Sequence, residues 1–210
     1  RSSHLSQFIL HRGLIISFIQ VVFSSIFHFA AIAIYNGWLL VGYATFYTMA
    51  PVFSLVLDKD VPDTVALTFP ELYRELQQGR ALSMKTFHIW VFTSIYQGGA
   101  IMLMTLFLFE DNLLNIVSIT FTALIATELL NIAVEIRTWN ALMVASEVLT
   151  ALMYVASIFV LRGTYFDVAF ILSWAFVWRV VVVTLVTCLP VYLARYIRHR
   201  LHPPAYLKLK

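Results

Sequence analysis

The stretch that decides the fold is residues 13–57, which read GLIISFIQVVFSSIFHFAAIAIYNGWLLVGYATFYTMAPVFSLVL and contain no Asp, Glu, Lys or Arg. A helix that crosses a lipid bilayer needs about 20 predominantly apolar residues. At 45 residues, this stretch is long enough for two crossings. Its one strong turn dipeptide, Asn36-Gly37, places the reversal of the chain between them.

Four more apolar stretches follow. Residues 86–109 carry no charge, and the other three, at 113–134, 141–161 and 168–194, are each interrupted by a single charged residue. The whole chain of 210 residues is 61% hydrophobic and 12% charged, whereas soluble domains carry about 25% charged residues. We therefore predict an all-α fold, a polytopic membrane bundle with six transmembrane helices.

Lys and Arg residues gather at one set of ends of these predicted helices. Twelve of them flank these ends, and Arg162 alone flanks the opposite ends. Loops on the cytosolic side of a membrane carry an excess of Lys and Arg, so both termini are predicted to be cytosolic. The twelve are Arg1, Arg12, Lys59, Arg74, Arg80, Lys85, Arg137, Arg195, Arg198, Arg200, Lys208 and Lys210.

The predicted spans divide the chain into four parts. These are a first transmembrane hairpin at 1–57, a cytosolic loop at 58–85, a four-helix transmembrane support bundle at 86–194 and a basic cytosolic tail at 195–210. Within the loop, Thr68 is predicted to cap a short helix that starts near Pro70 and stops at Gly79. The loop could be a docking platform or a connector lying on the membrane. The tail is expected to attract anionic headgroups.

Familiar catalytic and metal-binding motifs do not occur in the sequence. There is no P-loop, G-x-S-x-G, H-E-x-x-H or C-x-x-C motif. The only cysteine, Cys188, lies in an apolar stretch, which excludes a disulfide framework and a zinc cluster. The net charge of +3 comes from basic residues at the ends of apolar stretches, a pattern that does not favour nucleic acid. We predict no catalytic residue, no metal site and no nucleic-acid partner.

Ionisable and amide side chains within the predicted spans are the first set of site candidates, because such groups are costly in a bilayer. Glu128 and Asn131 lie one helical turn apart, Glu147 lies in the next span and Arg179 near the middle of the last. We predict that Arg179 pairs with Glu128 or Glu147. Such a pair could simply hold three helices together or belong to a functional site.

Milder polarity marks the first two spans. The first carries Gln20, Ser24 and Ser25, and the second carries Thr48 and Ser54 on either side of Pro51. A proline inside a membrane helix frees a backbone carbonyl and bends the helix, which is tolerated beside a partner or a polar cavity. We predict a polar groove between these spans, with ordinary helix packing through small polar residues as the alternative.

Short motifs of the predicted loop and the span after it match a known family. Residues 69–73 (FPELY), 78–80 (QGR), 85–87 (KTF) and 96–98 (YQG), together with Trp90, resemble type IV P-type ATPases, the phospholipid flippases. Residues 11–17 (HRGLIIS) and 51–61 (PVFSLVLDKDV) resemble the subgroup that works without an accessory glycoprotein subunit on Golgi and endosomal membranes.

The resemblance implies that these residues are the last six of ten transmembrane helices of a pump that moves phospholipid from the exoplasmic to the cytosolic leaflet. ATP and Mg²⁺ are expected to bind upstream domains, because the Asp-Lys-Thr-Gly and Gly-Asp-Gly motifs are absent here. The chain begins at Arg1 rather than Met, so we expect it to be a piece of a longer protein. The alternative is a stand-alone membrane scaffold or binding protein without transport activity.

The resemblance also directs attention to particular residues of the first two spans. Arg12-Gly13 stands where many members have a basic residue followed by Asn, and Pro51-Val52 stands where a double proline is common. The candidates for the lipid path or its coupling to ATP are Arg12, Gln20, Ser24, Ser25, Thr48, Pro51 and Ser54.

Overall fold

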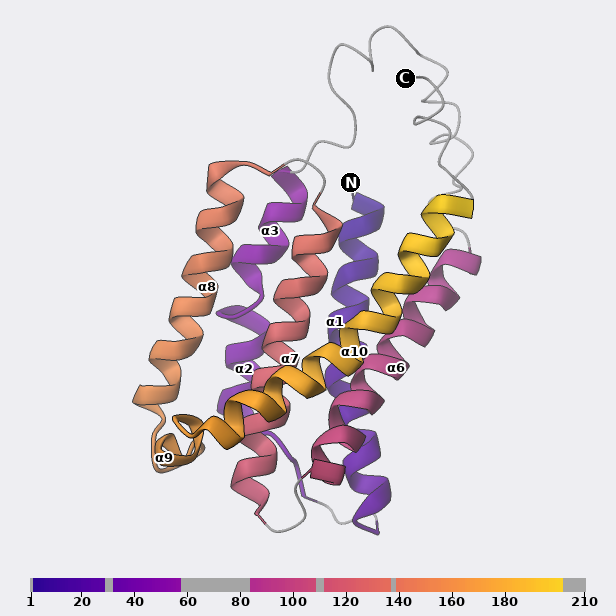
Figure 1. The fold of residues 1–210 in the computed structure, drawn as a ribbon. Coiled ribbons are helices and arrows are strands. Elements are labelled where there is room, and N and C mark those ends of the chain that lie inside the picture. The colour runs from indigo at the N-terminus through magenta and orange to yellow at the C-terminus, as the bar shows by residue number, and fades with distance from the viewer. Residues whose placement is uncertain (1, 29–31, 58–83, 109–111, 137–138, 202–210) are drawn as a thin grey trace, which may run out of the picture.

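The computed structural model describes residues 2–28, 32–57, 84–108, 112–136 and 139–201, which form helices and no β-strand (Figure 1). The predicted helix near Pro70 and the end of the predicted tail lie outside these residues. The helices are α1 (Ser2–Ile26), α2 (Gly37–Thr45), α3 (Met49–Leu57), α6 (Met84–Leu108), α7 (Leu113–Glu135), α8 (Ala141–Val160), α9 (Val168–Ile171) and α10 (Trp174–Leu201).

Five of these helices have the length and composition of membrane spans. They are the segments Leu5–Ile26, Met84–Leu108, Leu113–Glu135, Ala141–Val160 and Trp174–Ile197. Backbone polar groups have no water to bond with in hydrocarbon, so a span satisfies them within its own helix. The chain is therefore a multi-pass membrane protein whose described part is all-helical.

The predicted second span consists of two nine-residue helices, α2 and α3, separated by residues 46–48. The backbone N–H groups of Phe46 and Tyr47 both donate to the Gly42 carbonyl, and the Thr48 hydroxyl donates to the Tyr43 carbonyl at 2.6 Å. The Tyr47 ring lies against Gly42, where a Cβ atom would come within 2.9 Å of it. Side chains have thus replaced regular helical bonds at this break, one turn before Pro51.

Helix α7 is the centre of the bundle. It packs against α3, α6 and α10, while α1 packs against α6 and α8 packs against α3. Figure 1 shows α10, in orange to yellow, crossing obliquely over α7 and α6. Side chains on all sides of α7 are buried, among them Ile119, Phe121 and Leu124. A helix that is apolar all round is stable only inside a bundle or a bilayer, and α7 occupies the bundle interior.

Helices α1 and α6 are in close contact at Gly98. A Cβ atom at this position would lie 2.7 Å from the Ile15 backbone oxygen and 2.9 Å from the Phe18 Cβ. The neighbouring Gly99 has nothing within 4 Å of such an atom. Of these two glycines, only Gly98 is needed for the close packing of α1 on α6.

Exposed tryptophans mark the two ends of the bundle. Trp38 lies in the first turn of α2 and Trp174 begins α10, and their side chains are 74% and 79% exposed. Trp139, which is 50% exposed, lies at the opposite end, in the link between α7 and α8 (Figure 1). Tryptophan is enriched at both interfaces between membrane and water. Tryptophans at both ends are consistent with a bilayer that covers the helices between them.

Candidate functional site

A cluster of polar side chains surrounds the break between α2 and α3. Arg12 Nη1 on α1 donates to Thr48 Oγ1, and the Arg12 guanidinium carbon lies 6.0 Å from the centre of the Tyr43 ring. The Tyr43 hydroxyl oxygen lies 3.1 Å from the Arg12 carbonyl oxygen and 3.1 Å from Glu128 Oε1. We call Arg12, Tyr43, Thr48 and Glu128 the Arg12 cluster; it joins α1, α2, the break and α7.

Arg12 is the only member of the Arg12 cluster whose side chain is not fully buried. Thr48 and Glu128 are each 1% exposed, whereas Arg12 is half-buried. A guanidinium held by a neighbouring hydroxyl and an aromatic ring presents fixed N–H donors, and such donors suit phosphate and carboxylate groups. The Arg12 cluster can therefore receive an anionic group from one side while its other members remain inside the bundle.

A second buried cluster lies beside the first and links α1, α6 and α7. His11 Nδ1 lies 2.6 Å from Ser94 Oγ, and His11 Nε2 lies 3.3 Å from Asn131 Nδ2. The amides of Gln97 and Asn131 bond to each other at 3.1 and 3.4 Å. We call His11, Ser94, Gln97 and Asn131 the His11 cluster. All four side chains are at most 2% exposed. The cluster therefore stabilises the contact between three helices inside the bundle.

Near one end of the bundle, α10 is tied to α7 by an ion pair. Arg195 Nη1 lies 2.8 Å from Glu135 Oε2, and the Arg195 guanidinium carbon lies 5.3 Å from the centre of the Trp90 ring. Trp90 also meets His11 edge to face, with ring centres 5.2 Å apart. This contact connects the ion pair to the His11 cluster.

Replacing Asn131 by Ala should lower the free energy of unfolding by about 1–2 kcal/mol, because it leaves His11 and Gln97 with unpaired polar atoms in the interior. Ser25→Ala is the matched control. The Ser25 hydroxyl is exposed and bonds only to the Val21 carbonyl of its own helix, so we expect a change within about 0.5 kcal/mol. Chemical denaturation of the purified protein in detergent measures both. Equal losses in the free energy of unfolding for the two variants would contradict a stabilising role for the His11 cluster.

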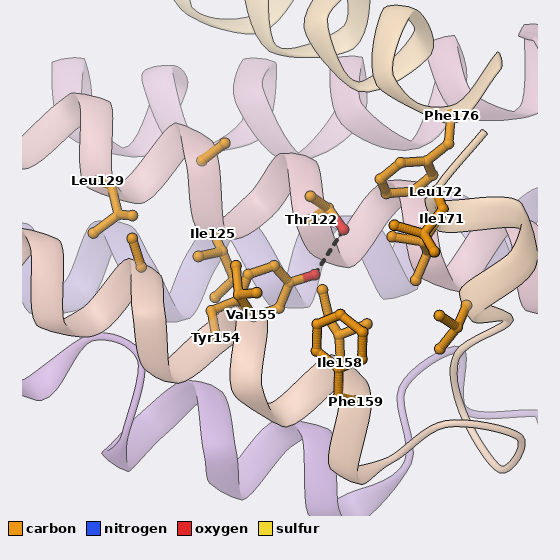
Figure 2. Close-up of a pocket in the computed structure, with 13 residues that line it drawn as sticks. Thr122, Ile125, Leu129, Tyr154, Val155, Ile158, Phe159, Ile171, Leu172 and Phe176 are labelled. Carbon is orange, nitrogen blue, oxygen red and sulfur yellow. Dashed lines mark hydrogen bonds between the residues drawn. The ribbon is translucent and has the colours of Figure 1, made fainter. Parts of the chain in front are cut away.

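An apolar pocket elsewhere in the bundle offers no comparable chemistry. It has a volume of about 350 Å³ and lies between α7, α8, α9 and the start of α10. Figure 2 shows its only two hydroxyls, those of Thr122 and Tyr154, bonded to each other at 2.6 Å. The rest of its lining is hydrocarbon, for example Ile125, Val155 and Phe176. It has no polar group left for a headgroup, and the candidate site is the Arg12 cluster.

Comparison with known proteins identifies the family to which these helices belong. Residues 1–204 match the family model described as the C-terminal part of phospholipid-translocating P-type ATPases. The chain belongs to this family. The resemblance to type IV P-type ATPases is thereby confirmed.

Individual flippases are similar over the whole chain. It is 54% identical over 209 residues to the probable phospholipid-transporting ATPase IIB of Bos taurus. It is 49% identical over 209 residues to the probable phospholipid-transporting ATPase tat-5 of Caenorhabditis elegans and 45% identical over 213 residues to the phospholipid-transporting ATPase NEO1 of Saccharomyces cerevisiae. Each match covers 100% of this chain but only 18–19% of the relative. The chain thus spans about a fifth of the length of these relatives.

The seven candidates for the lipid path or its coupling to ATP do not form a single site. Arg12 and Thr48 meet in the Arg12 cluster. Gln20 bonds to Ser24 Oγ at 2.9 Å and to the backbone of residues 32 and 34. Gln20 and Ser24 line an open pocket of about 500 Å³ between α1 and the chain that leads into α2. Arg12 and Gln20 therefore mark two separate polar places along α1.

The other three candidates make no described contact with either place. Ser54 on α3 bonds to Ser146 on α8, with 2.6 Å between the two hydroxyl oxygens. Ser25 lies on the exposed side of α1. Pro51 lies in the first turn of α3, where a missing backbone N–H is tolerated.

The predicted pairing of Arg179 with Glu128 or Glu147 is wrong for the residues that the structure describes, since no ion pair joins them there. Arg179 lies over the Trp178 ring at 5.4 Å, and Glu128 bonds to Tyr43. For Glu128 the reason is the register of α10 against α7. Arg195 pairs with Glu135, and Arg179 precedes Arg195 by 16 residues while Glu128 precedes Glu135 by only seven. The remaining nine residues of helix rise separate the two levels by about 13 Å.

Sequence reasoning missed four members of the two clusters, namely Tyr43, His11, Ser94 and Gln97. One signal was available on α6, where Ser94 and Gln97 are one helical turn apart within an apolar span. Among the described residues, no group of three or more His, Cys, Asp or Glu side chains could hold a metal ion.

Proposed function

We propose that this chain forms the membrane support bundle and one wall of the lipid path in an ATP-driven phospholipid translocase that moves lipid from the exoplasmic to the cytosolic leaflet. The observation that carries this proposal is the half-buried Arg12 guanidinium at the break of the second span. A lipid phosphate is an anion, and a fixed guanidinium binds it through two parallel N–H donors. Membership of the family supplies the class of substrate.

The proposed direction of transport gives the order in which a headgroup meets the two polar places on α1. Gln20 and Ser24 lie in the second half of α1, beside the chain that leads into α2, and Arg12 lies nearer the start of α1. Eight residues separate Arg12 from Gln20, which corresponds to about 12 Å along the helix. A headgroup moving toward the cytosol passes the pocket at Gln20 first and reaches Arg12 second. Ser25, Pro51 and Ser54 stay candidates for coupling rather than for direct contact.

In this proposal α2 and α3 together make one crossing, so the chain has six crossings and both termini are cytosolic. The supporting observations are the twelve Lys and Arg residues at one set of helix ends and the tryptophans at both ends of the bundle.

Single cysteines test this topology. Gly37→Cys and Thr164→Cys should react with a membrane-impermeant maleimide added from the exoplasmic side, and Trp139→Cys should react only from the cytosolic side. All three positions are exposed, and the native Cys188 is buried. Labelling of residues 37 and 139 from the same side would contradict the six crossings.

ATP and Mg²⁺ act in domains outside these residues, where a cytosolic aspartate is phosphorylated and dephosphorylated in each cycle. Those upstream domains of a longer chain are the proposed partners of the bundle. From the resemblance of residues 11–17 and 51–61 we further propose Golgi or endosomal membranes as the location, and function without an accessory glycoprotein subunit.

The direct test uses the full-length protein that carries this chain, reconstituted into vesicles with fluorescent phospholipids. ATP and Mg²⁺ should deplete the labelled lipid from the leaflet that corresponds to the exoplasmic side, and ATP without Mg²⁺ should not. An unchanged lipid distribution in active, phosphorylated protein would contradict the proposal and favour a scaffold.

A further inference from the structure

The carboxyl group of Glu128 has two oxygens in very different surroundings. Oε1 lies 3.1 Å from the Tyr43 hydroxyl, whereas Oε2 has no hydrogen-bond partner among the described residues. The whole residue is 1% exposed, so water does not reach it. An ionised carboxylate with an unpaired oxygen is far more costly in such a place than a neutral carboxylic acid.

The hydrogen bonds of Tyr43 also favour a protonated Glu128. Its hydroxyl has one hydrogen but two acceptors at 3.1 Å, the Arg12 carbonyl and Glu128 Oε1. If Glu128 is ionised, the two acceptors compete for that hydrogen. If Glu128 carries a proton on Oε1, it donates to the Tyr43 oxygen, and Tyr43 donates to the Arg12 carbonyl. Every hydrogen in the chain of bonds then has its own acceptor.

The charged and titratable groups around Glu128 do not supply a direct counter-charge. Arg12 faces it from α1, but its Nη1 donates to Thr48, and no cation of the described residues lies within 4 Å of the Glu128 carboxyl. Tyr43 faces it from α2, and Cys188 and Tyr192 face it from α10. Among the described residues, the nearby cation Arg12 is thus bonded to Thr48 rather than to Glu128.

We propose that Glu128 is a proton-binding site that is loaded in this conformation and that its occupancy decides the partner of Arg12. When another conformation admits water and the proton passes to it, the carboxylate attracts the Arg12 guanidinium away from Thr48. Thr48 also bonds to the Tyr43 carbonyl across the break between α2 and α3. Loss of the proton therefore removes the hydrogen bond that joins α1 to this break. The consequence for lipid movement rests on the proposed function, but the proton site itself does not.

Infrared spectroscopy tests the proton directly. The reconstituted full-length protein should show the carbonyl stretch of a protonated carboxylic acid, and Glu128→Gln should remove a band that Glu147→Gln leaves in place. Glu147 is the control because it is a half-buried carboxyl in the next span along the chain, whereas Tyr43 bonds to Glu128. A spectrum unchanged by Glu128→Gln would overturn the proposal. The measurement needs no turnover, so its result does not depend on whether the protein moves lipid.

A pair of variants tests the link to Arg12. Glu128→Gln should unfold within about 2 °C of the wild type, because a neutral amide can donate to Tyr43 as the protonated acid does. Glu128→Ala should unfold at least about 5 °C lower, because no group on α7 then bonds to Tyr43. Equal losses of stability in both variants, measured by thermal unfolding of monodisperse protein, would mean that the ionised carboxylate is required and would overturn the proposal. If the wild type itself is inactive, the proposed function fails while the infrared result still decides the proton site.

Discussion

Arg12→Ala is expected to lower lipid-stimulated ATP turnover at least about tenfold in the full-length protein, because hydrogen bonds to charged groups contribute about 1.5–3 kcal/mol. Arg12 is the cation at the open edge of its cluster, and it bonds to Thr48 at the break of the second span. Its removal takes away both the donors for a lipid phosphate and the contact that ties α1 to the break. ATP turnover measured with and without added phospholipid reads the effect.

Two further variants separate charge from geometry. Arg12→Lys keeps the positive charge but loses the planar pair of donors, so we expect turnover between those of the wild type and Arg12→Ala. Arg179→Ala, at matched expression, removes a cation that lies over Trp178 and away from the Arg12 cluster, and turnover should stay within about threefold of the wild type. Wild-type turnover in Arg12→Ala would remove Arg12 from the mechanism.

Gly98→Ala is expected to destabilise the protein by about 2 kcal/mol or more, as overpacking of a close contact commonly does. The new methyl group would lie 2.7 Å from the Ile15 backbone oxygen and 2.9 Å from the Phe18 Cβ. Neither atom is the end of a flexible side chain, so α1 and α6 must move apart. Thermal unfolding followed by size-exclusion chromatography measures the loss.

Gly99→Ala is the matched control, since it places the same methyl group on the next residue of α6 with nothing within 4 Å. Alanine is a better helix former than glycine by about 0.5–1 kcal/mol, so this variant should be as stable as the wild type or slightly more stable. A Gly98→Ala protein that unfolds at the same temperature as Gly99→Ala would show that α1 and α6 can separate without cost.

The long helices could be predicted from the sequence because a bilayer leaves few alternatives. The charge-free stretch at 86–109 corresponds to α6 (Met84–Leu108), and the stretch at 141–161 corresponds to α8 (Ala141–Val160). The division of the second span could not be predicted from hydropathy. It depends on the Tyr47 ring lying against Gly42 and on a hydroxyl that replaces a backbone bond, and both α2 and α3 are as apolar as an unbroken span.

The site could be predicted only in part, for a related reason. Arg12, Thr48 and Glu128 are visible as polar residues in apolar stretches, but which of them meet depends on the rotation and register of the helices. The pair of Arg195 with Glu135 sets that register, and nothing in the spacing of α10 identifies Arg195 rather than Arg179 as the partner. Tyr43 and His11 were not predicted because aromatic residues are common in membrane spans, and the sequence does not show which residues they bond to.

The central position of α7 has a consequence for how the protein is made. Glu128 and Asn131 would be exposed to lipid if α7 left the translocon by itself, and single polar residues at that depth are costly. Their bonding partners, Tyr43, His11 and Gln97, all come earlier in the chain. Ribosomal synthesis therefore delivers α7 to a membrane that already contains the helices able to accept its polar side chains.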